Sequence, residues 1–85
     1  SHADFSKLDC ISLCLDTLTE REREVLTYLI AGLLNKQVAY ELDIAERTVK
    51  AHRKRIFEKM KVASIAELVR LTEKAGLQPF KTDQP

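Results

Sequence analysis

NKQVAYELDIAERTVKAHRK, residues 35–54, is the most informative stretch of this chain. Apolar residues recur at helical spacing on both sides of Asp43-Ile44-Ala45, which predicts one helix over 36–42 and another over 46–61. So short a connection makes the two helices meet at a steep angle. Ala39 is small where they cross, and Asp43 tolerates the left-handed backbone that such a turn needs. This is the pattern of a helix-turn-helix unit.

The segments on either side add two more helices. Thr19 and Glu22 form a capping box, an apolar stripe follows, and Gly32 is placed to end the helix in a left-handed cap, so we expect a helix over 20–31. Asn35 is the predicted cap of the helix over 36–42.

Ser64 and Glu67 form a second capping box, and the helix they begin is predicted to run over 65–75, with Gly76 ending it. The expected fold is all-α, a four-helix helix-turn-helix bundle. The spacing of apolar residues in 3–16 is weaker and fits either a helix or an ordered linker.

The length of 85 residues is that of one domain. Two Gly and two Pro leave few turns, which disfavours all-β folds and glycine-rich phosphate loops. We expect three parts: a linker with a tag remnant at Ser1 and His2 over 1–17, the helix-turn-helix domain over 18–76, and a frayed tail over 77–85. No membrane span or signal peptide is recognised.

Charge is concentrated in one segment. The chain has a net charge of +1, but residues 46–61 hold seven basic and two acidic side chains, a local net charge of +5. A helix over these residues places its apolar side chains on one face and cationic ones on the other. A concentrated basic element is typical of a protein that binds nucleic acid or another acidic surface.

The predicted partner is double-stranded DNA, because a helix about 10–12 Å across fits a major groove about 12 Å wide. Lys50 and Lys54 lie one turn apart and can donate to guanine, and the Ala51 methyl can contact a thymine methyl. The predicted base-edge contacts are Lys50, Ala51, Lys54 and Arg47. The predicted phosphate contacts are Lys36, Asn35, Thr48, His52 and Lys59. For Lys59 the alternative is a solvated charge.

Other chemistry is poorly supported. Cys10 and Cys14 lack the further ligands of a zinc site, and we interpret them as small core or interface thiols in a reducing cytoplasm. His52 has basic neighbours, and Glu58 lies on another side of the helix, so a catalytic pair is not formed. We predict no catalytic residue, no metal, no cofactor and no small-molecule ligand.

Residues 18–71 resemble the LuxR/FixJ-type DNA-binding domain. The resemblance is carried by LTEREREVL at 18–26, GLLNKQVA at 32–39, LDI at 42–44 and TVKAH at 48–52, followed by Ile56, Lys59 and Met60. It implies a four-helix, NarL-like effector domain that binds DNA as a homodimer in the bacterial cytoplasm and regulates transcription, with RNA polymerase as a candidate partner.

The resemblance also implies that the last helix supplies dimer contacts, which we assign to Ile65, Leu68, Val69 and Thr72, and that a phosphorylated receiver domain controls such modules in response regulators. The chain departs from the family at Ala45, where members usually have Ser or Thr, so the following helix loses a side-chain cap.

Two alternatives remain. One is a sigma-factor region that reads the promoter −35 element, although a further amphipathic helix at 65–75 is unusual there. The other is an interaction module whose basic helix docks on an acidic protein, which salt-insensitive association and no affinity for duplex DNA would indicate.

Overall fold

The computed structural model describes residues 10–80, which are helical at 10–16 and then form four helices. These are α2 (Glu20–Ile30), α3 (Asn35–Leu42), α4 (Glu46–Met60) and α5 (Ile65–Lys74). The expected all-α fold is confirmed, and each predicted helix boundary agrees to within one residue. The prediction of a tag remnant at Ser1 and His2 lies outside the described residues.

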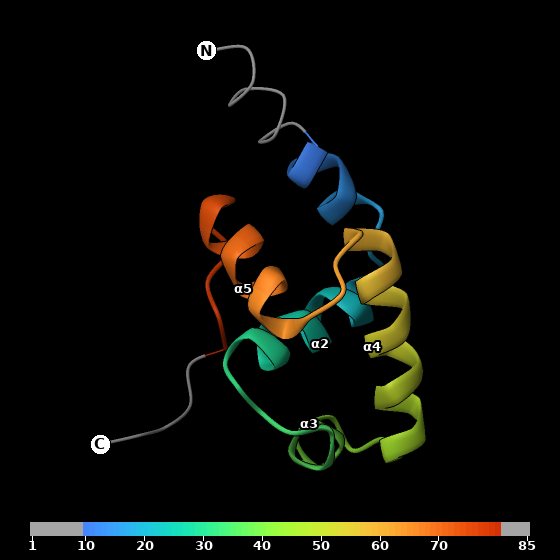
Figure 1. Cartoon of the computed structure of the whole chain (residues 1–85). Coiled ribbons are helices and arrows are strands. Elements are labelled where there is room, and N and C mark those ends of the chain that lie inside the picture. The colour runs from blue at the N-terminus through green and yellow to red at the C-terminus, as the bar shows by residue number, and fades with distance from the viewer. Residues whose placement is uncertain (1–9, 81–85) are drawn as a thin grey trace, which may run out of the picture.

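α2, α4 and α5 surround a common apolar core, and α3 crosses beside the start of α4 (Figure 1). Each helix contributes its apolar stripe, and burial of a Leu, Ile or Val side chain stabilises the fold by about 1.5–3 kcal/mol. The core residues are Leu18, Val25, Leu26, Leu29, Val38, Ala39, Val49, Ile56, Met60 and Leu68.

The turn between α3 and α4 has the predicted geometry. Asp43 adopts the left-handed conformation with φ 55°, and its N–H donates to the Tyr40 carbonyl over 3.3 Å. The Ile44 N–H donates to the Ala39 carbonyl over 3.0 Å, which closes the end of α3. Ile44 then packs against the core, so that the turn is anchored from inside.

The helix caps are partly as predicted. The box of Thr19 and Glu22 is complete, and Gly32 has the positive φ of 93° expected after α2. Asn35 is not the cap of α3. It is the first residue of that helix, and the preceding Leu34 N–H donates to Gln37 Oε1 over 2.8 Å. Gln37 can reach back in this way because it stands three residues after Leu34.

Of the two hydrogen bonds in the capping box predicted for Ser64 and Glu67, only one forms. The Glu67 N–H donates to Ser64 Oγ over 3.2 Å, but Glu67 Oε1 accepts from the Ala63 N–H, not from Ser64. One feature was not foreseen: Lys61 ends α4 in the left-handed conformation with φ 58°.

Segments outside the predicted bundle also pack against it. In the helical segment 10–16, Ile11 is buried, and Cys14 and Leu15 pack against the core. After α5, Leu77 packs against the core and the Phe80 N–H donates to the Thr27 carbonyl over 2.9 Å. The expectation of a frayed tail is therefore wrong for residues 77–80, and 81–85 lie outside the described residues.

Candidate nucleic-acid interface

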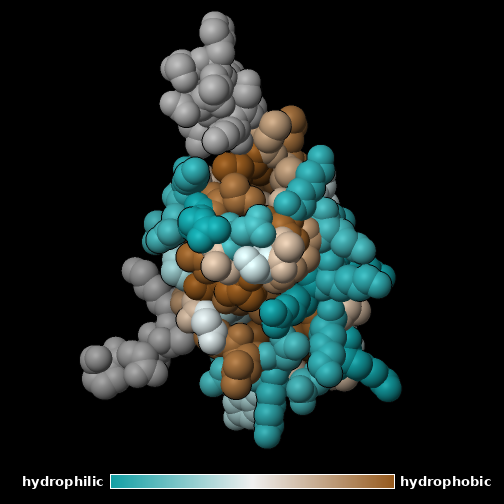
Figure 2. Space-filling model, viewed as in Figure 1, coloured by the Kyte–Doolittle hydropathy of each residue, from teal (hydrophilic) through white to brown (hydrophobic). Residues whose placement is uncertain are grey.

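α4 presents the cationic face that its sequence predicts. Arg47, Lys50, Ala51 and Lys54 are all exposed, whereas Val49 and Ile56 on the other side are fully buried. Figure 2 shows hydrophilic side chains gathered along the edge of the molecule formed by α4. No ion pair formed within residues 10–80 engages Lys50 or Lys54. Their ammonium groups are available to an external anion.

The start of α4 lacks a side-chain cap, as expected from Ala45. Ala45 has the extended backbone of a cap residue, with φ −72° and ψ 148°, but only its carbonyl takes part, accepting from the N–H groups of Thr48 and Val49 over 3.0 and 3.2 Å. No side-chain oxygen at the cap position therefore accepts a hydrogen bond from the N–H groups in the first turn of α4. Thr48 is half-buried, and Arg47 beside it is exposed.

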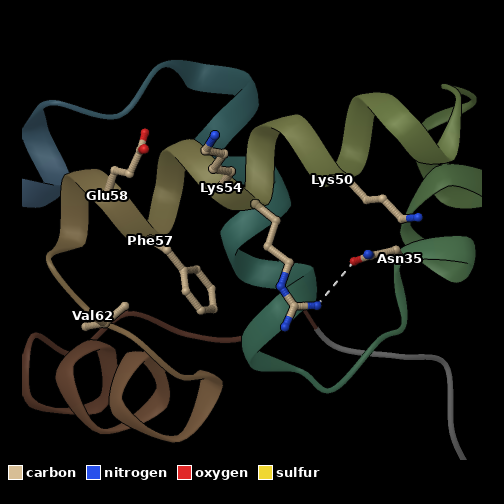
Figure 3. A pocket seen from close by; sticks show the side chains of 7 residues that line it. Asn35, Lys50, Lys54, Phe57, Glu58 and Val62 are labelled. Carbon is tan, nitrogen blue, oxygen red and sulfur yellow. Dashed lines mark hydrogen bonds between the residues drawn. The ribbon is translucent and has the colours of Figure 1, made fainter.

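A groove runs beside α4 where the start of α3 approaches it. It is an open depression of about 490 Å³, and it is lined by Asn35, Lys50, Arg53, Lys54, Phe57, Glu58 and Val62. Figure 3 shows Phe57 projecting from α4 toward Val62, while Lys54 and Glu58 project on another side of the helix. The groove thus brings two apolar side chains, Phe57 and Val62, together with three basic ones and the acidic Glu58.

Arg53 is a functional candidate that the sequence analysis left out of the site. Its guanidinium donates to Asn35 Oδ1 across a long hydrogen bond of 3.5 Å and lies 5.3 Å from the centre of the Phe57 ring (Figure 3). A cation over an aromatic face is attracted by the ring quadrupole. The spacing of Arg53 and Phe57, four residues apart on one helix, is the signal that could have identified the pair.

The predicted phosphate contacts are distributed unevenly. Lys36 is exposed at the start of α3, and Asn35 next to it is half-buried and bonded to Arg53. His52 is half-buried, and its Nδ1 is buried without a hydrogen-bond partner among the described residues. The imidazole is thus turned partly into the domain.

Lys59 does not lie free on the surface. Its ammonium forms a 2.6 Å ion pair with Glu22 Oε1 and donates to the Thr17 carbonyl over 3.2 Å. The Glu22 side chain is only 3% exposed. We therefore withdraw Lys59 from the predicted phosphate contacts, because a buried carboxylate already takes its charge.

The environment of Glu22 keeps this carboxylate ionised. Burial alone raises the pKa of Glu22. The hydrogen bonds from Lys59 and from the Thr19 N–H, together with the nearby charges of Lys59 and His52, outweigh burial and lower the pKa below its ordinary value.

Two of the four predicted dimer contacts are wrong. Leu68 is 0% exposed and belongs to the core, and Thr72 is 1% exposed with its hydroxyl donating to the Leu68 and Val69 carbonyls. Side chains this deeply buried cannot touch a second copy. Ile65 and Val69 are half-buried and keep part of their apolar surface outside.

The described residues offer little for other chemistry. Residues 10–80 contain no group of three or more His, Cys, Asp or Glu side chains that could hold a metal ion. In the same part of the chain, no helix is both long and apolar enough to cross a membrane.

Comparison with known proteins gives one consistent result. The family described as bacterial regulatory proteins, luxR family, matches residues 16–72. The transcriptional regulatory protein FixJ of Rhizobium meliloti is 46% identical over 79 residues, covering 93% of this chain and 39% of that protein. The response regulator protein TodT of Pseudomonas putida strain F1 is 56% identical over 59 residues, covering 69% of this chain and 26% of that protein.

Two solved structures share the fold. Full-length FixJ from B. japonicum superposes with a TM-score of 0.77 at 40% identity, over 88% of this chain and 37% of that one. The response regulator StyR gives 0.76 at 52% identity, over 78% and 33%. This chain therefore spans only about a quarter to two fifths of these relatives.

Proposed function

This chain belongs to the LuxR family of bacterial regulatory proteins, and we propose that it is the DNA-binding effector domain of a two-component response regulator. In this proposal α4 enters the major groove of double-stranded DNA and reads its sequence to regulate transcription. The relatives are named as transcriptional and response regulators. The family match favours this function over the sigma-factor region and over a protein-interaction module.

The observation that carries the proposal is the exposed cationic face of α4, with Lys50 and Lys54 one turn apart and Ala51 between them. The buried stripe of the same helix fixes which side faces outward. Lysines at this spacing can donate to N7 and O6 of guanine in the major groove. The short side chain of Ala51 lets the helix backbone come close to the bases.

The proposed DNA contacts fall into two groups according to their position on the helices. Lys50, Ala51, Lys54 and Arg47 are the proposed base-edge contacts, since they share the exposed face of α4. Lys36, Asn35 and Thr48 are the proposed phosphate contacts, since they lie at or near the starts of α3 and α4, where helix dipoles favour anions. His52 stays in this group, although its Nδ1 is turned into the domain.

Pairing of two copies on DNA is a further part of the proposal. Ile65 and Val69 leave apolar surface on the outer side of α5, which could join two domains about a two-fold axis. A receiver domain on the same polypeptide would control this pairing, and RNA polymerase is a candidate partner of the assembled dimer. Such a regulator acts on chromosomal DNA, which places it in the bacterial cytoplasm.

Selection of bound duplexes from a random DNA pool tests the proposal. We expect enrichment of a defined sequence arranged as paired half-sites, with an affinity that falls steeply as salt increases. Replacing both Lys50 and Lys54 by Ala should abolish the enrichment, whereas Lys74→Ala, an exposed change on α5, should leave it intact. Absence of enrichment by the unaltered chain, or binding that ignores salt, would contradict the proposal.

A further inference from the structure

The C-terminal end of the helical segment 10–16 is held by cationic side chains from two other helices. Arg23 of α2 donates to the Leu15 carbonyl over 2.7 Å, and Lys59 of α4 donates to the Thr17 carbonyl over 3.2 Å. The last carbonyls of a helix lack partners within it and carry the negative end of its dipole. Cationic donors at this point therefore fasten the segment to the domain.

Lys59 joins three parts of the chain at one ammonium group. Besides Thr17, it binds the buried carboxylate of Glu22, and the same Glu22 oxygen accepts from the Thr19 N–H over 3.0 Å. The link between residues 10–16 and α2 is thus tied to the last turn of α4. Any displacement of one part must stretch or break a short contact to another.

These contacts complete a pair of polar anchors on α4. Near its middle, Arg53 makes a long and therefore weak contact of 3.5 Å to Asn35 of α3, and near its end Lys59 makes the much shorter contact of 2.6 Å to Glu22 and also donates to Thr17. Between them lies the apolar stripe, whose packing is not directional. Hydrogen bonds are directional and weaken steeply when misaligned. The anchors therefore limit rotation and sliding of α4 against the bundle.

We propose that Lys59 is a positioning residue for DNA recognition, which couples docking of residues 10–16 to the orientation of α4. The inference rests on the proposed function, because it concerns the helix that we place in the major groove. A segment preceding the domain can in this way act on DNA affinity without touching DNA. The groups that carry this coupling are the Lys59 ammonium, the Glu22 carboxylate and the Thr17 carbonyl.

The first test is the salt dependence of binding by the 85-residue chain, using a labelled duplex taken from the selection above. Lys59→Met should weaken binding about tenfold, within the range of roughly 5- to 150-fold typical of coupling between sites. The slope of affinity against salt should stay unchanged. Loss of a phosphate contact would instead reduce that slope by about one. Arg70→Met, which removes a charge from an exposed position on α5, is the control.

Lys59→Met leaves Glu22 buried without its partner, so the fold itself could be lost. A second variant therefore combines Glu22→Gln with Lys59→Met. The glutamine side chain keeps an oxygen to accept from the Thr19 N–H, and no buried charge is left unpaired. Glu22→Gln alone retains an acceptor for Lys59 and should keep most of the DNA affinity of the unaltered chain.

The second test needs no DNA. Cys14 lies in the helical segment and is half-buried, whereas Cys10 is exposed. In a Cys10→Ser background, alkylation of Cys14 should become severalfold faster when Lys59→Met or the double variant releases the segment. Arg70→Met should leave the rate unchanged.

The two tests separate the possible failures. If the unaltered chain does not bind duplex DNA, the proposed function fails, and the alkylation rates still report whether Lys59 fastens the segment. If the unaltered chain binds but the double variant keeps full affinity, the coupling is wrong. A reduced salt slope with unchanged alkylation would also overturn it and return Lys59 to the phosphate contacts.

Discussion

The ring of Phe80 lies 4.4 Å from the ring of Tyr28, centre to centre, with the two planes inclined by 37°. Together with the hydrogen bond from the Phe80 N–H to Thr27, this contact fastens the segment after α5 to α2. Tyr28 is half-buried there. Its pKa is raised by burial and by the nearby charges of Glu41 and Glu24, against the opposing charge of Arg21.

Replacing Phe80 by Ala should therefore destabilise the domain. An aromatic pair contributes about 0.5–1.5 kcal/mol beyond its buried area, and each kcal/mol lost lowers the Tm of a domain this size by about 4–8 °C. Thermal unfolding followed by circular dichroism measures the change. Gln78→Ala, at an exposed position of the same segment, is the matched control. If Phe80→Ala had the same Tm as Gln78→Ala, the contact of Phe80 with Tyr28 would contribute nothing to stability.

Replacing Ala45 by Ser should stabilise the domain. Ala45 already has the backbone of a cap residue, and its methyl group cannot accept a hydrogen bond from the first turn of α4. A serine oxygen at this position is typically worth about 1 kcal/mol. Urea unfolding should show a higher midpoint with the same m-value. Ala75→Ser, at the opposite end of a helix, should give no such gain.

Acid should remove the contribution of Glu22 to stability. Its pKa is lowered in the folded chain below the ordinary value of a glutamate, so the folded state favours the ionised form. The stabilisation is fully present above the unfolded pKa and is lost as pH falls through the lower folded pKa. The free energy of unfolding, measured from pH 7 downward, should decline less steeply for Glu22→Gln below about pH 4.5. Parallel curves for both proteins would contradict this.

Lys50 and Lys36 should respond differently to truncation. Lys50→Ala should cost about 1–3 kcal/mol in binding and relax the preference at one base pair, since it is assigned to a base edge. Lys36→Ala should weaken binding to all sequences alike and reduce the salt slope by about one, as expected for a phosphate contact. Binding measured on the selected duplex and its single-base variants distinguishes them. Uniform weakening by Lys50→Ala would remove Lys50 from base readout.

Local signals in the sequence were sufficient for the helices and for the outward face of α4. The capping box of Thr19 and Glu22, the left-handed Asp43 and the missing cap at Ala45 were all predicted from residue type and spacing, and all are present. Such features depend on atoms a few residues apart. The exposure of Lys50 and Lys54 follows from the same helical period, because the apolar stripe had to face inward.

The roles of individual side chains on these helices needed the tertiary structure. Lys59 and Glu22 are 37 residues apart, and no spacing rule connects a lysine late in one helix with a glutamate in a cap. Similarly, Leu68 and Thr72 share the amphipathic α5 with Val69, and only the packing shows that they face the domain's own core.

Sequence patterns alone were enough to predict the four helices between residues 20 and 75, to within one residue at each end, and the cationic face of α4, because these properties arise from short-range geometry. Three pairings became visible only in the folded chain: the ion pair of Lys59 with Glu22, the contact of Arg53 with Asn35, and the packing of Phe80 on Tyr28. Each pairing joins residues that are distant in sequence. Whether such residues come close in space is decided by how the whole core packs.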